Sequence, residues 1–303
     1  MRIALIAHPS LGSKVLEAIL KRGEEVVVVF APGGAPEKPA PLKSLATENG
    51  IPVYEPGHMK NAGVYESMAR YEPELGILAF VSDIIPLAIL KCPKKETIMY
   101  HPSLLPKHRG GSALNWPIIQ GESKTGLSII WPDQGIDTGP ILLQKEVDIL
   151  PDDTMGSLFF NKLYPMGVDA LVEAIQLVKE GKAPRIPQDD SQATYEPLCQ
   201  EQHGIIDWTK SVPEVYNLIR GTNPRPGAST TWQGQKLKIF DSKINSTSGA
   251  APGEVVLISK GGFAVVCQNG SIMVNQVQPA GSSKISAAEF VKNVNLKKGD
   301  RLG

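Results

Sequence analysis

The densest group of side chains able to do chemistry is the run Met99–Gly111, which holds two histidines, a lysine and an arginine. His101 within it can act as a general acid or base, because an imidazole changes its charge near neutral pH. Pro102 and Pro106 restrict the backbone that follows, so the imidazole is expected on a stiff loop. A purely structural histidine is the competing interpretation, and both stay open at this point.

A second candidate run is Trp131–Gly139, with the sequence Trp-Pro-Asp-Gln-Gly-Ile-Asp-Thr-Gly. Its glycines permit a tight loop that can aim a carboxylate back toward a histidine. A carboxylate beside an imidazole selects its tautomer and raises its basicity, which makes an acid–base pair. A plain turn is the alternative role for these aspartates, and the residue pattern alone does not bring the two runs together.

Both runs follow predicted strands. Apolar segments rich in β-branched residues alternate with stretches of helical spacing, which predicts an α/β fold with a Rossmann-like, doubly wound, mostly parallel sheet. The carboxyl ends of strands in such a sheet face the ligand crevice, and the run from Met99 begins at such an end. The predicted strands are Arg2–Ala7, Glu25–Phe30, Pro52–Tyr54, Leu75–Phe80, Thr97–Tyr100, Ser128–Trp131 and Ile141–Ile149, and the predicted helices are Lys14–Lys21, Leu42–Asn49, Val64–Tyr71 and a long one from Asp153 or Thr154 to about Lys179.

The pattern changes after residue 181. Residues 182–204 contain three prolines and many polar side chains, which is typical of a linker. A short helix near Val212–Arg220 precedes strands and tight turns that predict a small OB-like, antiparallel β-barrel. We therefore expect a catalytic domain over 1–181, a linker over 182–204 and a β-barrel domain over 205–303. The predicted strands of the barrel are Leu237–Ile239, Glu254–Ile258, Phe263–Cys267 and Ile272–Val277.

Composition argues against several classes of protein. Hydrophobic residues make up 42% of the 303 residues, and no apolar run reaches the roughly 20 residues that span a bilayer. The first segment reaches His8 after only five apolar residues, too few for a signal peptide, so we expect a soluble cytoplasmic protein. The cysteines and histidines lack metal-ligand spacing. The turn Ala7–Ser13 lacks Gly-x-Gly-x-x-Gly, which disfavours a nicotinamide site.

The net charge of zero conceals a division along the chain. Residues 205–303 hold 12 Lys and Arg against 6 Asp and Glu, a net of +6, whereas residues 1–204 hold 19 against 25. A basic C-terminal third can meet a polyanion such as a nucleic acid. Random variation between two surfaces explains the same division, so both interpretations stay open.

The run His-x-Ser-Leu-Leu-Pro-x-x-Arg-Gly starting at His101, followed 36 residues later by Asp137 within Gly-Ile-Asp-Thr-Gly, resembles the 10-formyltetrahydrofolate-dependent formyltransferase family. Members of this family include methionyl-tRNA formyltransferase, glycinamide ribonucleotide formyltransferase and the hydrolase domain of 10-formyltetrahydrofolate dehydrogenase. The resemblance covers nearly the whole chain. Residues 1–200 are most similar to that hydrolase domain, and the C-terminal part is more similar to methionyl-tRNA formyltransferase.

The resemblance implies that His101 and Asp137 are catalytic. It also implies 10-formyltetrahydrofolate as co-substrate, no metal, and a pterin held largely by backbone groups of two loops together with Asp137. The loop residues that it implies for cofactor binding are Asp83, Ile84, Ile85, Ser103, Leu104, Leu105 and Pro106.

Met99 departs from the pattern of the transferases, which usually carry Asn two residues before the histidine to help hold the formyl oxygen. Methionine has no hydrogen-bond donor, and the dehydrogenase's hydrolase domain also has an apolar residue there. The loss of one such donor typically costs about 10²–10³ in rate. Either another donor replaces the amide, or the reaction is not ordinary transfer to an amine.

We therefore expect an enzyme that releases tetrahydrofolate from 10-formyltetrahydrofolate, by formyl transfer to an amine acceptor or by hydrolysis to formate. His101 would act as general base or stabilise the oxyanion, and Asp137 would orient it and assist proton removal. The cations Lys107, His108 and Arg109 would bind an anionic acceptor or the folate tail, or form ordinary solvated loop charge.

Two alternatives remain. Initiator methionyl-tRNA is the rival acceptor, favoured by the basic C-terminal third. It is disfavoured by Met99 and by the short loop Pro32–Pro41, whose only cation is Lys38. A non-catalytic folate-binding module is the alternative from another class, and Met99 is the feature that motivates it.

Overall fold

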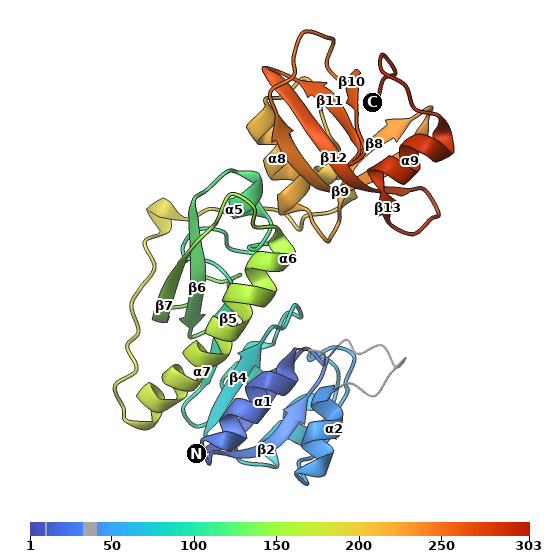
Figure 1. Ribbon diagram of the computed structural model, residues 1–303. Coiled ribbons are helices and arrows are strands. Elements are labelled where there is room, and N and C mark those ends of the chain that lie inside the picture. The colour runs from blue at the N-terminus through green and yellow to red at the C-terminus, as the bar shows by residue number, and fades with distance from the viewer. Residues whose placement is uncertain (10, 33–40) are drawn as a thin grey trace. The chain divides into compact units, whose positions relative to one another are not determined.

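A seven-stranded sheet organises the N-terminal part of the computed structural model, which describes residues 1–9, 11–32 and 41–303 (Figure 1). Its strand order is β3-β2-β1-β4-β5-β6-β7. Strands β1 to β5 pair in parallel, and β6 runs antiparallel to β5. The mostly parallel sheet of the predicted α/β fold is thus confirmed. The strands are β1 (Arg2–Ala7), β2 (Glu25–Phe30), β3 (Val53–Tyr54), β4 (Leu75–Ala79), β5 (Thr97–His101), β6 (Lys124–Ile130) and β7 (Ile141–Asp148).

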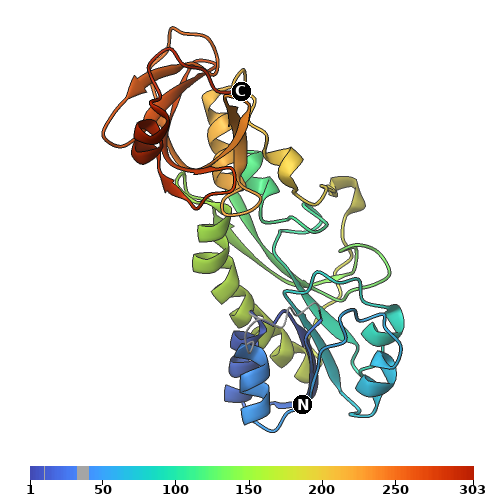
Figure 2. The same ribbon diagram turned by 90° about the vertical axis from the view of Figure 1, so that its right-hand side faces the viewer.

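Both faces of this sheet are covered by helices, and the side chains of β1 pack alternately into the apolar cores on the two faces. Ile3 and Leu5 of β1 pack in one apolar core with Leu16 and Leu171, whereas Ile6 packs in another with residues of the opposite face. Figure 2 shows the corresponding helices on the two sides of the strands. One side carries α1 (Gly12–Lys21), α2 (Pro41–Glu48) and α7 (Tyr164–Lys179), and the other carries α3 (Val64–Ala69) and α4 (Leu87–Leu90).

The long predicted helix begins directly after its cap residue, but it is interrupted. Thr154 caps α6 (Met155–Leu158) by accepting a hydrogen bond from the Ser157 backbone N–H, and the Ser157 hydroxyl completes a capping box. A π-helical segment, Phe159–Leu163, then separates α6 from α7. The loop Pro32–Pro41 with Lys38 lies outside the described residues, apart from its two ends.

An antiparallel sheet forms the C-terminal part, as predicted, with the path β10-β11-β12-β9-β8 and β13 paired to β12. Its core contains Phe263, Val274 and Phe290. The sequence patterns missed β8, α5 and α9, although Ser286 and Glu289 form a recognisable cap for α9. The elements are β8 (Ala228–Trp232), β9 (Gln235–Asn245), β10 (Val255–Ile258), β11 (Phe263–Cys267), β12 (Gly270–Pro279), β13 (Ile285–Ser286), α5 (Trp116–Ile119), α8 (Val212–Gly221) and α9 (Ala287–Val294).

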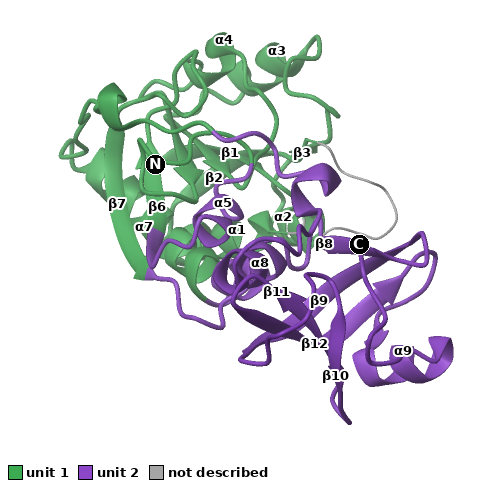
Figure 3. Ribbon diagram, turned by 90° about the horizontal axis from the view of Figure 1, so that it is seen from above, with its two compact units in different colours: residues 1–111, 126–147, 162–195 green, residues 112–125, 148–161, 196–303 purple. Residues whose placement is uncertain are grey.

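The chain forms two compact units that are interleaved along the sequence (Figure 3). The first contains residues 1–111, 126–147 and 162–195, and the second contains 112–125, 148–161 and 196–303. Residues 182–195, in the segment that resembles a linker, therefore belong to the first unit. The predicted division into 1–181, 182–204 and 205–303 stays a prediction. Over the ranges 1–9, 11–32 and 41–303 we find no helix whose length and apolar character would let it cross a bilayer.

Candidate active site

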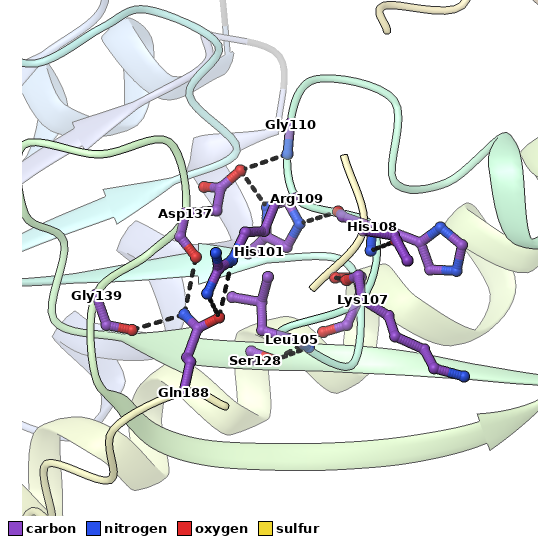
Figure 4. Close-up of polar contacts among 12 residues, drawn as sticks. His101, Leu105, Lys107, His108, Arg109, Gly110, Ser128, Asp137, Gly139 and Gln188 are labelled. Atoms are coloured by element: carbon purple, nitrogen blue, oxygen red, sulfur yellow. Dashed lines mark hydrogen bonds and ion pairs between the residues drawn. The ribbon is translucent and has the colours of Figure 1, made fainter. Parts of the chain in front are cut away.

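His101 is the last residue of β5, where its buried imidazole has one partner on each ring nitrogen (Figure 4). Its Nε2 lies 2.9 Å from the His108 carbonyl oxygen, and its Nδ1 lies 3.5 Å from Oδ2 of Asp137. A carbonyl oxygen only accepts, so Nε2 is the atom that carries a proton. A neutral imidazole would then turn its Nδ1 lone pair toward a carboxylate oxygen, and the contact becomes favourable when one further proton lies between these two atoms.

Asp137 approaches His101 from a loop whose position does not follow from the rule that the carboxyl ends of parallel strands meet at one edge of a sheet. Its loop follows β6, which runs antiparallel to β5, so the chain must fold back toward His101. The backbone of Asp137 is in the left-handed region at φ 56°, which is strained for a residue with a side chain. Gly139 permits the close turn, because a Cβ there would clash with the Trp131 carbonyl oxygen. Asp137 Oδ2 also accepts a hydrogen bond of 2.8 Å from Gly110 N.

The loop after His101 is held by side-chain hydrogen bonds as well as by its prolines. The Ser103 hydroxyl donates to the Lys107 carbonyl at 2.7 Å. The Ser128 hydroxyl donates to the Ser103 carbonyl at 2.7 Å and accepts from Leu105 N at 3.1 Å. Ser103 and Leu105 are buried within the loop, and Leu104 and Pro106 are partly exposed. The Ser103 hydroxyl thus serves the loop itself.

Arg109 is not solvated, and groups of the chain itself already bind its guanidinium. Its side chain is 2% exposed. The guanidinium donates through Nε and Nη2 to Gln188 Oε1, through Nη2 to Asp190 and through Nη1 to the Tyr195 hydroxyl. Burial acts to lower the pKa of Arg109, but the hydrogen bonds to Asp190 and Tyr195 outweigh it and raise that pKa.

These partners all come from residues 184–195, which we call the strap. The strap pairs with β7 through reciprocal backbone hydrogen bonds between Ile141 and Ile186, at 2.8 and 2.9 Å. The Thr194 hydroxyl accepts from His108 N at 2.8 Å, and the Thr194 carbonyl accepts from Arg109 N at 3.0 Å. The sequence patterns missed every strap residue, because polar and proline-rich segments have neither periodicity nor motif.

Asp83, predicted in a folate loop, joins two loops to each other. Its Oδ2 accepts from Met59 N at 2.6 Å, and its Oδ1 lies 3.4 Å from His58 Nδ1. Ile84 is 80% exposed and Ile85 is partly exposed. A pocket lined by His8, Phe80 and Asp83, among other residues, lies beside the ends of β1 and β4. The strand order reverses between β1 and β4, and ligands of open α/β sheets bind at such points.

Met99 presents no polar atom to the site. It precedes His101 by two residues in β5, so the two side chains emerge on the same face of the strand. Its side chain packs against a small apolar cluster of Leu105, Ile130 and Ile141. The position where the resemblance leads one to expect an asparagine thus makes an apolar contact.

Cysteine and metal chemistry find little support in the part of the chain that is described. Burial raises the pKa of Cys199 to about 11 and that of Cys267 to about 12, so neither thiol is a ready thiolate near neutral pH. No group of three or more His, Cys, Asp or Glu side chains comes together there with the spacing of a metal site.

A doubly wound sheet with a His–Asp pair at a strand end is an α/β fold with a candidate acid–base site. A family model described as formyl transferase matches residues 1–175, and one described as formyl transferase, C-terminal domain, matches residues 199–295. The chain therefore belongs to the formyl transferase family. The resemblance predicted from the runs at His101 and Asp137 is confirmed.

Individual relatives fall into two groups. Cytosolic 10-formyltetrahydrofolate dehydrogenase of Mus musculus is 38% identical over 96% of this chain and 34% of the relative. Methionyl-tRNA formyltransferase of Trichlorobacter lovleyi is 37% identical over 99% of this chain and 96% of the relative. The chain thus spans about a third of the length of the dehydrogenases that it matches.

Solved structures show the same fold at lower identity. HypX from Aquifex aeolicus in complex with tetrahydrofolic acid superposes with a TM-score of 0.72 at 19% identity, over all of this chain and 50% of that chain. The sugar 3N-formyl transferase WlaRD has a TM-score of 0.70 at 19% identity, over 93% and 99% of the two chains. The fold class predicted for this chain is confirmed.

Proposed function

We propose that this protein takes the formyl group of 10-formyltetrahydrofolate, passes it to an amine or to water, and releases tetrahydrofolate. The observation that carries the proposal is the contact of His101 Nδ1 with Asp137 Oδ2 at the carboxyl end of β5, in a chain of the formyl transferase family. The fold and the relatives named as 10-formyltetrahydrofolate dehydrogenase and methionyl-tRNA formyltransferase support the same donor.

The acid–base pair accounts for the proton steps. The attacking amine or water forms a bond to the formyl carbon, and the carbonyl electron pair moves to oxygen. As imidazolium, His101 stabilises this oxyanion through its positive charge, since both ring nitrogens already have partners in the chain, while the Asp137 carboxylate accepts the proton that the nucleophile loses. Collapse of the intermediate breaks the bond from carbon to N10, which takes a proton from the pair. The products are tetrahydrofolate together with a formylated amine, or with formic acid that loses its proton to solvent as formate.

Folate contacts at residues 83–85 and 103–106 remain part of this proposal. The carboxylate of Asp83 and the hydroxyl of Ser103 already have partners within the chain. Recognition of the pterin by backbone groups agrees with this, because the side chains then serve to hold the loops. The exposed Ile84 supplies an apolar surface at the first of these loops.

The test is a product analysis of the purified protein with 10-formyltetrahydrofolate. Release of tetrahydrofolate is followed by absorbance with and without candidate amines, and formate is assayed separately. Without an amine, water is the only nucleophile, so we expect formate, and a candidate amine is identified as acceptor if it diverts the formyl group from formate. Binding of folate without turnover under all conditions would contradict the enzyme and support the folate-binding module.

Initiator methionyl-tRNA is a second candidate acceptor. Two observations favour it: the bacterial relative named for that reaction matches over nearly its full length, and residues 205–303 carry a net charge of +6. Phosphate contacts by such a surface would weaken steeply as salt increases. We expect a mobility shift of this tRNA at low salt and formylation of its methionyl amine, and absence of binding at low salt would remove the candidate. A cytoplasmic location, predicted from the sequence, belongs to the same proposal.

A further inference from the structure

Gln188 of the strap joins the two loops that carry His101 and Asp137 (Figure 4). Its Oε1 accepts from Nε of Arg109 at 3.1 Å and from Nη2 at 2.8 Å. Its Nε2 donates to the Asp137 carbonyl at 2.8 Å and to the Gly139 carbonyl at 2.7 Å. One side-chain amide therefore connects the loop after β5 with the loop after β6.

The chemistry of these hydrogen bonds requires an amide. A glutamine has two acceptor lone pairs on oxygen and two N–H donors on nitrogen, and all four are used here. Glutamate would keep the oxygen that accepts from Arg109 but would turn a second oxygen toward two carbonyls. Methionine, of similar length, would make none of these hydrogen bonds.

The backbone that Gln188 holds needs such support. Asp137 has a left-handed φ of 56°, a conformation that persists only where surrounding contacts impose it. The Gln188 amide holds the carbonyl of Asp137, while Gly110, the residue after Arg109, donates to its carboxylate. The 3.5 Å contact with His101 Nδ1 is near the limit of direct interaction, so a small shift of this loop alters it.

We propose that Gln188 is a positioning residue, which acts through the backbone of Asp137 to hold its carboxylate against His101 Nδ1. The proposal rests on the proposed function for its kinetic readout. A misplacement of about 1 Å in such a pair can cost on the order of 10² in rate. We therefore expect kcat to fall by about 10–100-fold when the amide is replaced, with little change in KM for 10-formyltetrahydrofolate.

The experiment compares Gln188→Glu with the matched control Gln192→Glu in the full chain. Gln192 lies in the same strap and is exposed, and its side-chain amide donates to Asp189 within the strap. Both variants add the same charge, but only the first removes the bonds to Asp137 and Gly139. Gln188→Met is the second variant, since it removes the hydrogen bonds without adding charge. Thermal unfolding identifies folded variants before any kinetic comparison.

Two readouts separate positioning from a merely structural role. The first is the pH profile of kcat, whose limbs shift if the His–Asp contact changes but keep their shape if only part of the protein is unfolded. The second is the ¹⁵N NMR signal of His101 Nδ1, which reports that contact without any turnover. We expect both to change in the Gln188 variants and neither to change in Gln192→Glu.

The two possible failures are distinguishable. Folded Gln188 variants with wild-type kcat, pH profile and His101 signal would overturn the positioning role. An inactive wild-type protein would overturn the proposed function instead. In that case a changed His101 signal in the Gln188 variants would still support the positioning role, and an unchanged signal would refute it.

Discussion

The loop 101–111 and the strap 184–195 differ in how they contribute to the same site. The loop carries His101, and its residue types indicate acid–base chemistry from the sequence alone. The strap carries amide, hydroxyl and carboxylate groups that hold Arg109 and the Asp137 loop by hydrogen bonds. Because the partners of these groups lie far away in the sequence, no motif of neighbouring residues marks them.

The comparison predicts two kinds of mutant. Changes to the acid–base pair remove chemical groups and should lower activity with little effect on folding. Changes to the strap and to its partner Arg109 should lower stability or turnover in proportion to the hydrogen bonds that each change removes. Variants ranked by expected effect therefore test whether the loop supplies the chemical groups and the strap supplies the positioning.

Removal of either member of the acid–base pair should have the largest effect. His101→Ala and Asp137→Ala are each expected to lower kcat for tetrahydrofolate release by about 10²–10⁴-fold, the usual contribution of a positioned acid or base. Steady-state absorbance assays measure the rate, and circular dichroism checks the fold. Turnover of a folded variant within tenfold of the wild type would place the chemistry elsewhere.

Arg109→Met is expected to affect stability most. The substitution keeps an aliphatic chain of similar length but removes the hydrogen bonds between the loop and the strap. It also leaves Gln188 Oε1 without its donors. A buried polar group without a partner costs about 1–3 kcal/mol, and Gln188 is only partly buried, so the free energy of unfolding should fall by about 1–2 kcal/mol in urea titrations. Asp190→Asn is the control, because its side chain is 82% exposed and such a pair contributes about 1 kcal/mol or less. An equal loss of stability in both variants would show that the ion pair, rather than the amide and hydroxyl hydrogen bonds, holds the strap.

Thr194→Val should have a smaller effect. The substitution keeps the shape of the side chain but removes the oxygen that accepts from His108 N. Since His108 also supplies the carbonyl bound by His101 Nε2, we expect kcat to fall by less than tenfold and the free energy of unfolding by about 1 kcal/mol. Steady-state kinetics and urea titration measure both quantities. A fall in kcat as large as that of His101→Ala would make the strap part of the chemistry.

Glu201→Gln, beyond the strap, should have the smallest effect. Hydrogen bonds from Lys236 and Lys238 lower the pKa of Glu201 to about 2. A lowered pKa stabilises the folded state above the ordinary pKa of the carboxyl group, and this stabilisation is lost as pH falls toward 2. The variant should therefore have a slightly lower Tm at pH 7 and unchanged kcat, and the difference in Tm should shrink between about pH 4.5 and 2. A difference in Tm that grew on acidification would contradict the assignment.

Particular elements show how far sequence patterns reached. The strand Glu25–Phe30 was predicted with its observed bounds, because an uninterrupted run of β-branched residues suits a buried strand. The cap was predicted at Asp153 or Thr154, since side-chain capping is a local interaction, and Thr154 is the residue that caps the helix. The strand Ala228–Trp232 was missed, because Ser229 and Thr230 are polar residues whose burial comes from tertiary packing and does not follow from their residue type.

The amino-acid sequence by itself determined the alternation of strands and helices, the position of His101 at a strand end and the membership of a family. These follow from local propensities and from two short runs of residues, at His101 and at Asp137. Only the tertiary structure decided that Asp137 meets His101, that Arg109 is enclosed and that Gln188 joins their loops. These interactions link residues 36 to 86 positions apart in a sheet in which β6 runs antiparallel to β5, and no local pattern in the chain encodes their distances.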